Sequence, residues 1–127
     1  SEPDSAQALD VLEEWMRREV KMIAPPLIDY EVGSVLRKLS ARGRIDVDEA
    51  RQRLHIFESL HIGHVHPPFL LRRAWEMAVR HGLHTIYDAS YAALSELTGT
   101  RLYTCDQALI SALNWPSDMA VNPLGTA

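Results

Sequence analysis

An alternation of short apolar runs with longer segments of helical periodicity constrains the fold most. Apolar residues at three- and four-residue intervals predict helices over 3–18, 28–39, 46–60, 69–81 and 87–98, and a last helix that follows Asp106 and ends near Leu113. Short runs at 20–24, 61–66, 101–104 and 119–122 are predicted to be strands. Strands that alternate with helices form a parallel sheet covered on both faces. The sequence therefore predicts an α/β fold, a three-layer α/β/α sandwich.

Proline, glycine and capping residues mark the ends of these elements. Pro25 and Pro26 stop the first strand, and Asp46 with Glu49 three residues later marks the start of the third helix. Glycines in the position of a C-terminal cap are Gly43, Gly82 and Gly99. The chain contains no internal repeat and no linker, so we expect a single domain over residues 1–127.

Charge and cysteine content narrow the function classes. With 13 Lys and Arg against 17 Asp and Glu the net charge is −4, which excludes a basic coat over the whole surface. Because Cys105 is the single cysteine, no internal disulfide can form, and a reducing compartment is expected. No apolar run approaches the roughly 20 residues of a membrane span, and the acidic N-terminus is unlike a signal peptide. The expected location is the cytoplasm, with no membrane partner.

Three acidic residues lie at or near the starts of predicted helices. Asp106 comes directly after the strand 101–104, Asp88 opens the helix 87–98, and Glu31 lies in the first turns of the helix 28–39. Ligands of a parallel sheet bind beyond the carboxyl ends of its strands, so these acids are predicted near one edge. Clustered carboxylates repel one another unless they share cations, which favours a magnesium or manganese site suited to phosphodiester hydrolysis.

Each of these acids also has a simpler interpretation. Asp88 and Asp106 both stand where a helix N-cap is wanted, and capping alone would account for them. Asp29 and Glu31 flank the apolar stripe of their helix about equally, so periodicity does not choose between them. His61, His64 and His66 suggest zinc, but an ordinary strand region is favoured because no nearby residue completes the ligand set.

The segments that carry the acids resemble a known family. They are residues 24–32 (APPLIDYEV), 82–91 (GLHTIYDASY) and 102–106 (LYTCD). These segments resemble the acidic motifs of PIN-domain proteins, particularly VapC-type toxin ribonucleases, and the resemblance extends from about residue 2 to 122. It implies a PIN-like α/β/α fold in which Glu31, Asp88 and Asp106 hold Mg²⁺ (or Mn²⁺), and Thr104 supports Asp106 by hydrogen bonding. The implied activity is endoribonuclease cleavage of RNA by the toxin of a type II toxin–antitoxin pair. The implied partners are RNA, a cognate antitoxin protein and a second copy in a homodimer.

The chain departs from the family pattern at its start. Family members begin with a hydrophobic strand that ends in the first metal-binding acid, whereas residues 1–3 resemble the stretch after that strand. We therefore expect the natural protein to carry roughly ten or more residues upstream, and the chain as given to bind divalent metal weakly and to cut RNA poorly. The alternative is a non-catalytic PIN-like module that binds an antitoxin or RNA. A receiver-like signalling domain fits least, because it needs a lysine after a late strand and the only lysines are Lys21 and Lys38.

Basic and tryptophan residues are interpreted mainly as surface and packing features. The basic groups are Arg37, Lys38, Arg42 and Arg44, and Arg72, Arg73 and Arg80. A solvated face is favoured for each group, with RNA phosphate binding as the alternative. Trp15, Trp75 and Trp115 are interpreted as core or interface packing rather than as stacking platforms for bases.

Overall fold

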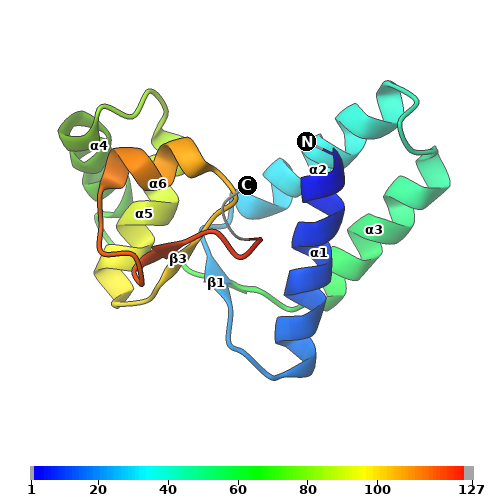
Figure 1. The fold of residues 1–127 in the computed structure, drawn as a ribbon, viewed down its shortest axis with the longest axis horizontal. Helices are drawn as coiled ribbons and strands as arrows, with labels where there is room; N and C mark the ends of the chain where they lie inside the picture. The colour runs from blue at the N-terminus through cyan, green and yellow to red at the C-terminus, as the bar shows by residue number, and fades with distance from the viewer. Residues whose placement is uncertain (1, 125–127) are drawn as a thin grey trace. The chain divides into compact units, whose positions relative to one another are not determined.

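The structure of the protein, a computed structural model, describes residues 2–124 in two compact units (Figure 1). The first unit extends to His64 and the second begins at Val65. Each unit has its own helices and its own pair of parallel strands. The hydrogen bonds that order the strands are therefore made within each unit.

The first unit contains three helices and two strands among its described residues. They are α1 (Glu2–Arg17), β1 (Ile23–Ala24), α2 (Ile28–Ala41), α3 (Val47–Ser59) and β2 (Gly63–His64). Strands β1 and β2 are parallel, with Ile23 opposite Gly63 and Ala24 opposite His64. Helices α2 and α3 pack against each other. Because α2 starts soon after β1, its first turn lies at the carboxyl end of this strand pair.

Capping and proline residues define the ends of these elements as the sequence predicts. Asp46 is the N-cap of α3, and its Oδ1 accepts a hydrogen bond from the backbone N–H of Glu49 at 2.7 Å. Pro25 is fully buried directly after β1. Phe57 and Leu60, near the end of α3, are buried and supply apolar contacts to the core of this unit.

The second unit also contains three helices and two strands among its described residues. They are α4 (Leu70–His81), α5 (Ile86–Thr98), β3 (Leu102–Tyr103), α6 (Gln107–Leu113) and β4 (Ala120–Val121). Strands β3 and β4 are parallel, with Leu102 opposite Ala120 and Tyr103 opposite Val121. Both Leu102 and Ala120 are buried, so this strand pair contributes to the core.

Small residues allow α4 and α5 to pack closely. The side chains of Ala74 on α4 and of Ala89, Ala92 and Ala93 on α5 are completely inaccessible to solvent. An alanine surface lets two helix backbones approach more closely than leucine or phenylalanine would. Gly82 ends α4 in the left-handed conformation, with φ of 65°, which a glycine adopts without steric cost. The α4–α5 hairpin thus positions the start of α5, where Asp88 lies.

Helix α4 also carries an exposed apolar stripe, formed by Leu71, Trp75 and Val79. These side chains are 68%, 59% and 64% exposed, although their four-residue spacing places them on one side of the helix. Trp75 therefore lies outside the core of its unit. We call this group of three residues the α4 stripe.

The ten predicted elements occur in the predicted order among the described residues, and the strand pairing is parallel as predicted. Each strand has only two residues, and the strands form two pairs, one in each unit. No helix in the described part of the chain is long and apolar enough to cross a membrane.

Candidate active site

Asp106 is held at the N-terminus of α6, directly after β3. Its Oδ1 accepts a hydrogen bond from the backbone N–H of Leu109 at 3.0 Å, so Asp106 is the N-cap of α6. Its own backbone N–H donates to Oγ1 of Thr104 at 3.1 Å. Thr104 thus orders the backbone of Asp106. The carboxylate is exposed and caps the helix through one oxygen, which leaves acceptor capacity for another ligand.

Asp88 lies in the first turn of α5 and is not its cap. The N-cap position belongs to Thr85, so capping does not explain Asp88. The residue is half-buried, and the neighbouring Ala89 and Ser90 are buried. A carboxyl group in this position has lost part of its hydration without gaining the role that a cap would give it.

The electrostatics of Asp88 connect it with Asp106. Burial raises the pKa of Asp88 above its usual range, and the negative charge of Asp106 raises the pKa further. Both residues belong to the second unit, with Asp88 in the first turn of α5 and Asp106 at the N-cap of α6. Both causes disfavour the ionised form of Asp88, and a shared cation would remove the repulsion between the two groups.

Glu31 and Asp29 both lie in the first turn of α2, in the first unit. Asp29 accepts a hydrogen bond from Nε2 of His64 at 2.9 Å. The hydrogen bond with His64 distinguishes Asp29 from Glu31, which helical periodicity did not. The role of Glu31 as a third metal-site acid stays a prediction from the family motif.

The donor set of the second unit suits a hard divalent cation. Among the residues that the structure describes, no three His, Cys, Asp or Glu side chains form a group that could hold a metal ion. Mg²⁺ usually keeps several waters and binds through one or two carboxylates together with substrate phosphates, so it does not need such a cage. The carboxylate oxygens of Asp88 and Asp106 are donors of the kind that Mg²⁺ or Mn²⁺ prefers, whereas a structural zinc site would need four ligands, rich in sulfur or nitrogen.

Parallel strands together with acids at the starts of α5 and α6 indicate the class to which the chain belongs. Residues 2–113 match the PIN domain family. The chain is a member of that family, as its acidic motifs predicted.

Named relatives and a solved structure agree with this assignment. Ribonuclease VapC9 of Mycobacterium tuberculosis is 35% identical over 89 residues, which are 70% of this chain and 68% of that protein. Ribonuclease VapC3 of Pyrobaculum aerophilum is 39% identical over 85 residues, which are 65% of this chain and 64% of that protein. The crystal structure of PAE2754 from Pyrobaculum aerophilum superposes with a TM-score of 0.71 at 31% identity, covering 85% of this chain and 79% of that one. These similarities confirm the α/β PIN-like architecture and the VapC-type family.

Proposed function

We propose that the protein is a metal-dependent endoribonuclease of the toxin type, with Asp88 and Asp106 as ligands of Mg²⁺ or Mn²⁺. The observation that carries the proposal is the position of two carboxyl groups at the starts of α5 and α6 in one unit, where the negative charge of Asp106 raises the pKa of Asp88. Relatives named ribonuclease VapC support the choice of RNA as substrate. An acid such as Asp88, whose ionised form is disfavoured by burial and by a neighbouring negative charge, is a candidate for a functional site.

Each acid has its own proposed role. The hydrogen bond from Leu109 fixes one oxygen of Asp106, and Thr104 fixes its backbone, so the second oxygen is held in a defined direction. Asp88 supplies the second carboxylate from a half-buried position. A bound divalent ion would lower the pKa of a water molecule and neutralise charge on the scissile phosphate. Glu31 is proposed as a third acid, which binds metal or orients the attacking water.

Exposed basic residues are candidates for contacts with RNA phosphates. Arg72, Arg73 and Arg80 on α4 are exposed, as are Arg37 and Lys38 on α2. Cationic side chains that contact phosphates position a nucleic acid without reading its sequence. We propose that some of these residues hold the RNA backbone while the acids act on one phosphodiester.

RNA cleavage with and without Mg²⁺ tests the proposal directly. We expect slow cleavage that requires Mg²⁺ or Mn²⁺ and that is lost in Asp88→Asn and Asp106→Asn, because each amide keeps the shape of the side chain and loses its charge. Glu96→Gln is a matched control, since Glu96 is exposed on α5 and lies away from its first turn. Equal cleavage by all four proteins would refute the assignment.

A non-catalytic PIN-like module that binds an antitoxin or RNA is the alternative function. Metal binding separates the two, because the module has no need of an ion at Asp88 and Asp106. In a thermal-shift experiment, Mg²⁺ should raise the melting temperature of the wild-type protein and leave both Asn variants unchanged. No stabilisation by Mg²⁺, together with no RNA cleavage, would favour the module.

Protein partners are also part of the proposal. The α4 stripe exposes three large apolar side chains on one side of a helix, which is typical of protein interfaces. We propose a second copy of the chain as its occupant and an antitoxin protein as the regulator of the toxin.

A further inference from the structure

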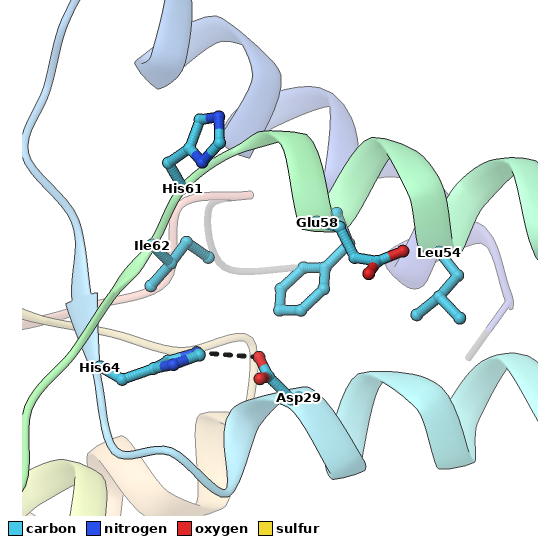
Figure 2. A pocket seen from close by; sticks show the side chains of 7 residues that line it. Asp29, Leu54, Glu58, His61, Ile62 and His64 are labelled. Atoms are coloured by element: carbon cyan, nitrogen blue, oxygen red, sulfur yellow. Dashed lines mark hydrogen bonds and ion pairs between the residues drawn. The ribbon is translucent and has the colours of Figure 1, made fainter.

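A cavity of about 360 Å³ lies within the first unit, lined by side chains of α2, of α3 and of the segment that leads to β2 (Figure 2). Its volume is near the lower end of the range for small-molecule sites, which is about 300–1,000 Å³. All of its lining residues belong to the first unit. The cavity therefore has the size of one side chain or one small ligand.

The polar part of its wall consists of two carboxylates, those of Asp29 and Glu58, and two imidazoles, those of His61 and His64. Asp29 projects from α2 and accepts the hydrogen bond of His64, and Glu58 projects from α3 (Figure 2). Within the described part of the chain, Glu58 makes no hydrogen bond or ion pair. No lysine or arginine lines the cavity. An anion placed here would meet two carboxylates without a permanent positive charge to offset them.

The remaining wall is apolar. Phe57 is buried, with 5% of its surface exposed, and it contributes to the lining together with Leu54 and Ile62. An apolar wall next to carboxylates suits a ligand that combines an aliphatic stem with a cationic head.

The cavity is distinct from the proposed catalytic acids. Asp88 and Asp106 belong to the second unit and do not line it. Asp29 and Glu31 are two residues apart on α2, so they project about 200° apart around the helix. The side of α2 that carries Asp29 into the cavity therefore faces away from the side that carries Glu31.

We propose that this cavity binds an alkyl guanidinium group. The stem lies against Phe57, Leu54 and Ile62, and the head lies between the carboxylates of Asp29 and Glu58. A guanidinium group presents five N–H donors in a plane and stacks on aromatic rings, so it can serve both carboxylates and also contact Phe57. A metal ion is a poorer occupant, because it would make no use of the apolar wall formed by Phe57, Leu54 and Ile62. The source is either an arginine of another polypeptide or a free small guanidine.

An NMR titration of the full chain without RNA or metal tests the proposal independently of ribonuclease activity. Butylguanidine is the probe, pentylamine is the ammonium comparator, and the signals are the Ile62 methyl groups and the His64 ring. We expect saturable shifts with a Kd of about 1 mM for the guanidine, as befits so small a ligand. Pentylamine should bind about threefold or more weakly, because an ammonium group cannot span two carboxylates in a plane.

Three variants test which acids bind the guanidinium group. Glu58→Gln and Asp29→Asn should each weaken butylguanidine about fivefold or more, and Glu96→Gln, with its exposed acid outside the cavity, should change the Kd by less than about twofold. Glu58 is exposed and has no partner to lose, so its variant should keep the fold even if Asp29→Asn disturbs His64. Shifts that never saturate, or equal weakening by all three variants, would overturn the proposal.

A last titration distinguishes the source of the group. The peptide acetyl-Gly-Arg-Gly-amide carries the same group on a polypeptide backbone. Binding at least as tight as that of butylguanidine supports an arginine of a partner chain, whereas binding tenfold weaker supports a free guanidine.

Discussion

Replacing Asp106 by Asn or by Ala separates its structural role from its proposed chemical role. As the N-cap of α6, Asp106 satisfies the backbone N–H of Leu109, which has no intrahelical acceptor. Asparagine caps a helix about as well as aspartate, whereas alanine leaves this donor unpaired and costs about 1 kcal/mol of unfolding free energy. For a chain of 127 residues that loss corresponds to a melting temperature lower by roughly 3–5 °C.

The negative charge of Asp106 has two smaller effects on stability, which oppose each other. A carboxylate at a helix N-terminus stabilises the helix by about 0.3–1 kcal/mol, and Asp106→Asn gives this up. The same substitution removes the negative charge that raises the pKa of Asp88, and so relieves a repulsion. Because the two effects oppose each other, we expect Asp106→Asn to melt within a few degrees of the wild type.

The assay combines thermal melts followed by circular dichroism with Mg²⁺-dependent cleavage of RNA. Both variants should lose the Mg²⁺-dependent cleavage, because removing a direct metal ligand costs more than the roughly 10–100-fold that is typical of residues that only orient a ligand. Only Asp106→Ala should lose stability. An alanine variant as stable as the asparagine variant would refute the capping argument, and an asparagine variant that cleaves normally would refute the metal-ligand argument.

Three further predictions follow from burial and charge. The raised pKa of Asp88 means that the folded state holds the proton of this carboxyl group more tightly than the unfolded state does. The stability that this proton contributes is full below the usual pKa of 3.8 and is lost as the pH rises through the pKa of the folded state. Asp88→Asn should therefore be more stable than the wild type at pH 7 and equally stable near pH 3, and urea unfolding curves that show no such convergence would contradict this. Trp75→Ser in the α4 stripe should leave the melting temperature of a monomer nearly unchanged but shift the protein toward monomer in sedimentation experiments, and unaltered oligomers would exclude this surface as the interface. Leu113→Ala should cost about 2–5 kcal/mol in urea unfolding because Leu113 is 2% exposed, and a loss below about 1 kcal/mol would show that the site collapses around the cavity.

Local chemistry explains which parts of the fold were predictable from the sequence. Pro25 after β1, the Asp46 cap of α3 and Gly82 at the end of α4 act within a few residues, so the chain specifies them without reference to its partners. The start of α5 shows the limit of this reasoning. Asp88 looked like a possible cap, but the helix begins earlier, with Thr85 at the N-cap, and the carboxyl group is left near Asp106 instead. Propensity alone places a helix boundary only to within a few residues.

The pairing of Asp29 with His64 depends on strand register, which the sequence does not reveal. The two residues are 35 positions apart, and no sequence motif contains both of them. The register of the first strand pair sets Ala24 opposite His64, and α2 begins shortly after Ala24, so its first turn is brought to the His64 side chain. A shift of one residue would point His64 to the other face of the strand pair and would remove Asp29 from its reach. Helical periodicity did not distinguish Asp29 from Glu31. The register of β1 and β2 places Asp29 at the cavity, and Glu31 lies on the other side of α2.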